Sequence, residues 1–88
     1  MKSRTQALSL LSKALNRVDS TIHDVKPEHT LRGYYGLTQI DLQDFRYHVE
    51  SALNITITDK DFELRMTSSI EECIIFLTEL TIENNGKN

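Results

Sequence analysis

Two amphipathic stretches separated by a long aperiodic segment are the feature that most limits how this chain can fold. Near the N-terminus, apolar residues recur at helical spacing, at Leu8, Leu11, Leu15 and Val18, with Ala7 and Ala14 beside them. This spacing predicts a first helix over residues 3–17 that faces its leucines toward a core. Residues 19–37 then hold the only proline and two of the three glycines. A connection this long in a compact domain is more often functional than accidental.

A second helix is predicted to begin at Thr38, whose hydroxyl can accept a hydrogen bond from a first-turn N–H. Asp41 places a carboxylate where the helix dipole favours one. We expect the core-facing stripe of this helix to be Phe45, Val49, Ala52 and Leu53. The opposite side carries Asp41, Asp44, His48 and Ser51, with Glu50 nearby. The helix, which should end at Asn54, therefore has one apolar and one acidic face.

The next segment, Ile55–Asp59, alternates apolar and polar residues. A lone strand would have no partner, so we interpret the segment as an extended connector that places Ile55 or Ile57 in the core. Asp59 or Asp61 can then cap a short helix that runs to about residue 64.

A last helix is predicted after one of two overlapping capping boxes, Ser68 with Glu71 or Ser69 with Glu72. Its apolar residues follow at helical spacing: Ile70, Cys73, Ile74, Leu77 and Leu80. Cys73 is therefore expected to be a small core residue and not a reactive thiol. The predicted fold is all-α, with three longer helices, one short helix and a long loop between the first two.

Length and composition restrict the class of protein. Eighty-eight residues, 39% of them hydrophobic, support one small core. The apolar runs are too short to span a membrane and the N-terminus lacks a signal-peptide core, so we expect a cytoplasmic monomer without membrane insertion. One cysteine and three scattered histidines offer no metal-ligand spacing, and no metal is expected.

Charge is unevenly distributed along the chain. Residues 1–35 hold six Lys/Arg against three Asp/Glu, a net +3, whereas residues 36–88 hold four against ten, a net −6. Nucleic acid is a poor partner for the acidic part, because phosphate contacts need a basic face. A basic protein surface is a better complement. The alternative, that these charges only keep the surface soluble, stays open.

One stretch, Leu31-Arg-Gly-Tyr-Tyr-Gly-Leu-Thr-Gln-Ile-Asp-Leu-Gln-Asp-Phe45, resembles the acyl and peptidyl carrier proteins. In that family a long loop ends in Gly-Leu or Gly-Ala, and Asp-Ser-Leu and an acidic amphipathic helix follow. Val49–Asp59 is similar to the family's helix end and connector, and Met66–Ile70 to the entry of its last helix. The resemblance implies an acyl-carrier-protein-type four-helix bundle, with one domain over residues 1–82 and a polar tail over residues 83–88.

The resemblance fails at the residue that carries the family's chemistry. With Gly36 and Leu37 on the loop end, Gln39 takes the place of the serine that receives 4′-phosphopantetheine, and Thr38 that of the preceding aspartate. A carboxamide is not a nucleophile and cannot form the phosphodiester. No cofactor is therefore expected. The alternative is a genuine divergent carrier of fatty-acid, polyketide or related biosynthesis, loaded with 4′-phosphopantetheine at Thr38 or another hydroxyl.

The family resemblance also implies a docking face, because partner enzymes of carrier proteins use basic patches to bind acidic side chains along the second helix. The residues that we expect to bind a partner, such as an acyl-transfer or synthase enzyme, are Thr38, Gln39, Ile40, Asp41, Asp44, Tyr47, His48 and Glu50. Arg46 lies where the family has an apolar side chain, which suggests an altered set of partners. That this surface has drifted out of use is the other interpretation.

Intrinsic catalysis is not expected, because no Cys/His, Ser/His/Asp or paired-carboxylate arrangement can be assembled from these spacings. Tyr34 and Tyr35 have hydroxyls but no neighbouring base, so we expect them to pack the loop over the core.

Overall fold

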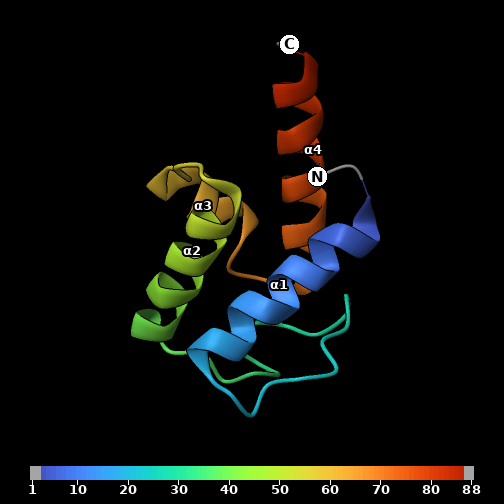
Figure 1. Cartoon of the computed structure of the whole chain (residues 1–88). Helices are drawn as coiled ribbons and strands as arrows, with labels where there is room; N and C mark the ends of the chain where they lie inside the picture. Colours follow the sequence, from blue (N-terminus) through green and yellow to red (C-terminus); the bar gives the residue numbers. More distant parts are fainter. Residues whose placement is uncertain (1–2, 87–88) are drawn as a thin grey trace.

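The computed structural model describes the backbone of residues 3–86 and the side chains of residues 3–80. This part of the chain forms four helices and no strand (Figure 1): α1 (Arg4–Val18), α2 (Gln39–Leu53), α3 (Asp59–Arg65) and α4 (Ile70–Gly86). The predicted all-α class, with three longer helices, one short helix and a long loop before the second, is confirmed. Residues 83–86 of the predicted polar tail continue α4, and residues 87–88 lie outside the described part.

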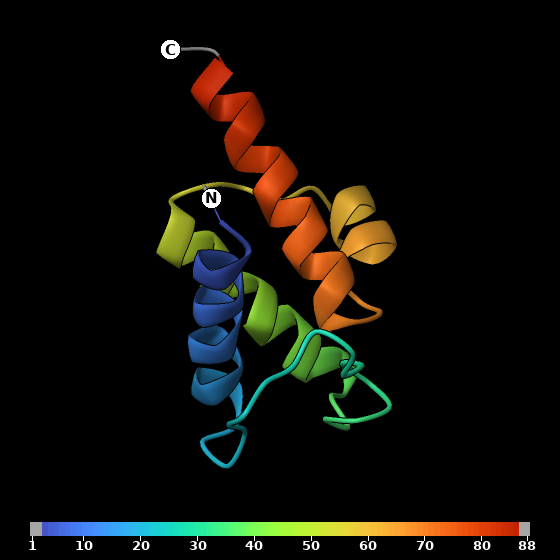
Figure 2. The ribbon, with the colours of Figure 1, turned by 90° about the vertical axis from the view of Figure 1, so that its right-hand side faces the viewer.

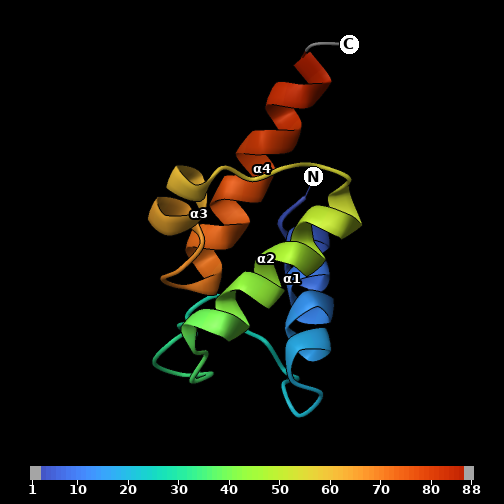
Figure 3. The same ribbon diagram turned by 90° about the vertical axis from the view of Figure 1, so that its left-hand side faces the viewer.

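Helix α1 packs against both α2 and α4, while the short α3 packs against α4. Figure 3 shows α1 and α2 side by side. The last turns of α4 extend beyond the other helices in every view (Figures 1 to 3). The long loop occupies the opposite end of the molecule, next to the start of α4 (Figure 2).

The core lies between the helices and takes residues from all four. Its largest fully buried side chains are Leu11 and Leu15 of α1, Leu42, Phe45 and Val49 of α2, Phe62 of α3, Ile70, Cys73, Ile74 and Leu77 of α4, and Leu31 and Met66 between helices. The prediction for Cys73 is confirmed. The prediction that Ala52 faces the core is wrong, because Leu42, Phe45 and Val49 form the buried stripe of α2 and Ala52 lies exposed at its edge.

The long loop binds the N-terminal end of α4. The Ile70 N–H donates to the His29 carbonyl (2.9 Å) and the Glu71 N–H to the Pro27 carbonyl (2.8 Å). The Leu31 N–H in turn donates to the Ser68 carbonyl (2.8 Å). The first N–H groups of a helix have no partner within that helix, so the loop supplies acceptors that α4 cannot.

Caps decide where the helices begin. Of the two capping boxes predicted before α4, the one of Ser69 and Glu72 is half formed: Ser69 Oγ accepts the Glu72 N–H (3.2 Å). The prediction that Asp59 or Asp61 caps α3 is wrong. Thr58 is the N-cap and its Oγ1 accepts the Asp61 N–H (3.1 Å), which leaves both aspartates in the first turn, where the helix dipole favours them.

The connector between α2 and α3 is extended and has no strand partner, as predicted. Asn54 ends α2 in the left-handed conformation (φ 55°), a conformation that asparagine adopts more readily than most residues. Ile57 is the residue that enters the core, and Ile55 packs half-buried against it. The connector therefore bridges α2 and α3 through one buried side chain.

Candidate functional site

The start of α2 is the position that the sequence singled out, and a complete capping box forms there. Thr38 Oγ1 accepts the Asp41 N–H (3.2 Å), and Asp41 Oδ2 accepts the Thr38 N–H (3.0 Å). The predicted N-cap is therefore confirmed. The two groups satisfy two N–H donors that would otherwise lack a partner.

Gln39 is the first residue of α2 and is exposed. Its Oε1 accepts a hydrogen bond from Arg32 Nη2 (3.3 Å), which reaches across from the long loop. The loop enters the helix through Gly36, whose φ of +66° is strained for a residue with a Cβ. The carboxamide thus lies on the surface, beside a cation and next to the N-terminal end of a helix.

One side of α2 brings together four of the predicted interaction residues, of which three are exposed and His48 is half-buried. We call Ile40, Asp44, Tyr47 and His48 the outer ridge. Ile40 is 81% exposed and Tyr47 is 61% exposed, and the two lie two helical turns apart. Asp44 lies between them along the helix, with its Oδ1 3.4 Å from His48 Nε2. The ridge therefore offers two exposed apolar side chains around a carboxylate.

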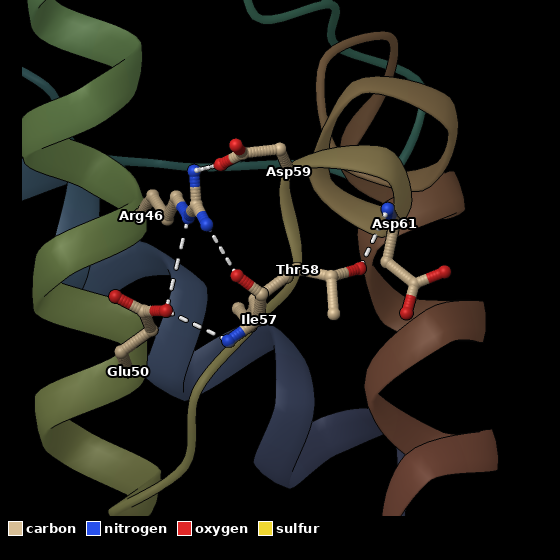
Figure 4. A network of polar contacts seen from close by, with 6 residues as sticks. All are labelled: Arg46, Glu50, Ile57, Thr58, Asp59 and Asp61. Atoms are coloured by element: carbon tan, nitrogen blue, oxygen red, sulfur yellow. Dashed lines mark hydrogen bonds and ion pairs between the residues drawn. The ribbon is translucent and has the colours of Figure 1, made fainter.

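Glu50, the remaining predicted interaction residue, lies on another side of α2 and belongs to a network that ties this helix to the connector (Figure 4). Its Oε2 accepts the Ile57 N–H (2.7 Å) and lies 3.7 Å from Arg46 Nε. The structure therefore separates Glu50 from the outer ridge and gives its carboxylate internal partners.

Arg46 is the centre of this network, and its role could not be assigned from the sequence. Its Nη1 donates to Asp59 Oδ1 (2.8 Å) and its Nη2 donates to the Ile57 carbonyl (Figure 4). Its guanidinium also lies 5.4 Å from the centroid of the Phe62 ring. One side chain therefore joins α2, the connector and α3. The signal in the sequence was that Arg46 stands where the resemblance to carrier proteins leads one to expect an apolar residue, and that Glu50 follows four residues later.

An aromatic cluster stabilises the long loop. The His29 and Tyr34 rings stack in parallel at 3.7 Å between centroids, and His29 Nδ1 lies 2.7 Å from the Tyr35 hydroxyl. Burial raises the pKa of Tyr35, which packs half-buried against the core as predicted. The same prediction is wrong for Tyr34, because stacking on His29 leaves it exposed on the loop surface.

Within the described residues, no three His, Cys, Asp or Glu side chains are grouped so that they could hold a metal ion. Burial raises the pKa of the Cys73 thiol to about 12, so this group is protonated at neutral pH. None of the helices, as far as they are described, is long and apolar enough to cross a membrane. Comparisons with protein-family models, with curated proteins and with solved structures returned no match.

Proposed function

We propose that this chain is a carrier-protein-like domain that carries no prosthetic group and acts as a protein-interaction module. It docks to a partner with a basic patch, an enzyme of acyl transfer or of a lipid or polyketide synthase, through the start and the outer ridge of α2. The observation that carries the proposal is the position of Gln39, exposed as the first residue of a capped acidic helix.

The order of elements supports the proposal. A long loop precedes α2, an extended connector and a short helix follow it, and a last long helix closes the chain. This order is the one that the resemblance to carrier proteins implies. The assignment to an acyl-carrier-protein-type bundle, over residues 1–82, is part of the proposal.

The chemistry at the start of α2 argues against loading. Gln39 has a carboxamide in place of a hydroxyl, and an amide does not attack a phosphoanhydride. Thr38 has a hydroxyl, but that oxygen already accepts the Asp41 N–H, and the threonine is half of a reciprocal cap. Loading at Thr38, the alternative function, would place a bulky phosphodiester on the oxygen that caps the helix.

Docking is supported by the outer ridge. An exposed isoleucine and tyrosine on either side of a carboxylate suit a partner with an apolar contact surface inside a basic rim. Glu50 is omitted from this surface because its carboxylate accepts the Ile57 N–H.

Intact-mass measurement tests the missing attachment site. The chain is incubated with coenzyme A and a promiscuous phosphopantetheinyl transferase, next to the variant Gln39→Ser. We expect no mass change in the natural chain and a gain of one phosphopantetheinyl group in Gln39→Ser. A gain in the natural chain would overturn the proposal, and peptide mapping would then show whether Thr38 carries the group.

The same variant tests the register and the docking face. If Gln39→Ser stays unmodified while a genuine carrier is loaded in parallel, the proposed alignment to carrier proteins is wrong. Adding Asp44→Lys to Gln39→Ser reverses the charge in the middle of the outer ridge without touching the serine or the cap. We expect the double variant to be modified with a lower kcat/KM than Gln39→Ser. An unchanged value would show that the outer ridge is not part of the docking surface.

A further inference from the structure

A groove of about 850 Å³ lies between α1 and α2, on the flank of the outer ridge. Leu10, Ala14 and Ala52 supply its apolar lining. Lys13 and Arg17 of α1 and Tyr47 and His48 of α2 also line it. Ala14 is buried at the floor of the groove, whereas Ala52 is small and exposed, which leaves room for another element to approach α2 closely.

Lys13 and Arg17 are the charged groups of the groove on its α1 side. They lie four residues apart on one face of a helix that contains no Asp or Glu. No ion pair or hydrogen bond within the described residues engages either side chain, whereas Arg4, the other cation of α1, is paired with Glu71. Two like charges at this spacing weaken a helix, so an external anion would relieve their repulsion.

The groove and the outer ridge form one continuous face, because Tyr47 and His48 belong to both. The face is positive along α1, at Lys13 and Arg17, and carries the Asp44 carboxylate and the exposed Ile40 along α2. A patch with both signs of charge and apolar groups between them is self-complementary. Such patches suit the two-fold symmetric contact that is commonest among homodimers.

We propose that this face binds a second copy of the same chain. In the two-fold arrangement, α1 of each copy faces α2 of the other, and Lys13 and Arg17 approach Asp44 of the second copy. Tyr47 and Ile40 of each copy pack against Leu10 of the other. The expectation from the sequence was a monomer, and this proposal departs from it.

Self-association is independent of the proposed docking function, although both use the outer ridge. A bound second copy would cover Tyr47 and Asp44, so dimerisation and docking to a basic partner are expected to compete. Lys13 and Arg17 belong only to the dimer face. Substitutions there separate the two proposals, because they leave the docking surface and the start of α2 intact.

Sedimentation equilibrium of the whole chain, from micromolar to millimolar concentration, tests the proposal. We expect the weight-average mass to rise from 10.1 kDa toward twice that value, and the rise to weaken with added salt because the contacts are ionic. A mass that stays at that of the monomer over the whole range would overturn the proposal.

Charge exchange provides the decisive comparison. The variant Lys13→Glu/Arg17→Glu and the variant Asp44→Lys should each be monomeric, since each places like charges opposite each other. An equimolar mixture of the two should restore the dimer, because both contacts of the mixed pair again join opposite charges. This recovery also shows that the single variants are folded.

Two outcomes would contradict the second copy as the occupant. If Lys13→Glu/Arg17→Glu dimerises at the same concentration as the unsubstituted chain, the interface lies elsewhere on the molecule. A chain that stays monomeric but binds a polyglutamate peptide, with loss of binding in Lys13→Glu/Arg17→Glu, would assign the groove to an acidic partner instead.

Discussion

The two polar sides of α2 carry the same kinds of residue but contribute to the molecule in different ways. On one side, Arg46 and Glu50 have 17% and 23% of their side chains exposed and hold the connector to α3. On the other, Asp44 is 49% exposed and pairs only within its own helix, with His48. The position of a carboxylate around the helix axis therefore decides whether it is bonded within the molecule or exposed to solvent.

The difference follows from what each side faces. The extended connector presents backbone N–H and C=O groups to Glu50 and Arg46, and half-buried backbone groups need partners. The connector does not pass over Ile40, Asp44 and Tyr47, so these three side chains of the outer ridge stay exposed. Four predictions test this contrast, from the largest expected effect to the smallest.

The buried stripe supports both sides of α2, and losing it should disrupt both. Phe45 is 0% exposed at the centre of the helix. We expect Phe45→Ala to lower the free energy of unfolding by about 3–5 kcal/mol through lost burial and an unfilled cavity. This is a large share of the stability of a domain of this size. Urea denaturation measures this loss of unfolding free energy. The control variant Phe45→Leu should lose less. Equal losses for the two variants would contradict close packing around the ring.

Removing one carboxylate from each side tests the contrast directly. Glu50→Ala leaves the Ile57 N–H without its acceptor and should cost about 1–3 kcal/mol. Asp44→Ala removes an exposed carboxylate at a site compatible with helix and should change the free energy of unfolding by no more than about 0.5 kcal/mol. The urea midpoints of the two variants give the comparison. Equal losses would show that both sides are structural.

Thr38 and Gln39 provide a similar pair at the start of α2. Thr38→Ala removes the acceptor of the Asp41 N–H and should destabilise the chain by about 1 kcal/mol. Gln39→Ala loses one exposed contact to Arg32 and should stay within about 0.5 kcal/mol. Thermal denaturation followed by circular dichroism measures both. A larger loss for Gln39→Ala than for Thr38→Ala would show that the contact with Arg32 is structural.

The exposed ion pair between α1 and α4 can be compared with the half-buried network around Arg46. Arg4 and Glu71 join α1 to α4, with 56% and 38% of their side chains exposed. The hydrogen bond from Arg4 lowers the pKa of Glu71, so the stabilisation is present above the ordinary glutamate pKa and is lost as pH falls through the lowered value. Denaturation midpoints across that pH range should fall less steeply for Glu71→Gln. Identical profiles would show that the pair contributes nothing measurable.

Much of the fold could be predicted from the sequence, because helices and their caps depend on residues within one or two turns. The spacing of apolar residues in α1 and α4, the Thr38–Asp41 box and the burial of Cys73 all follow from such local patterns. Ala52 and the cap of α3 were mispredicted, since local patterns place the edge of a stripe and the first residue of a helix less firmly than the centre of either.

The candidate site was only partly predictable for the same reason. That Thr38 caps α2 and Gln39 follows it could be expected from adjacent residues. Which acids stay exposed could not be expected, because the role of Glu50 depends on a connector that returns to α2 after the helix has ended.

By itself, the sequence determined an all-α chain, the boundaries of α1 and α2 and the start of α4 to within a residue or so, and a carboxamide at the start of α2. Only the tertiary structure decided that the long loop supplies acceptors to α4, that Arg46 joins three segments, and that a basic groove lies beside the outer ridge. The physical reason is range. Periodicity and capping involve neighbours along the chain, whereas these contacts join residues that the sequence keeps far apart and that only packing of the helices brings together.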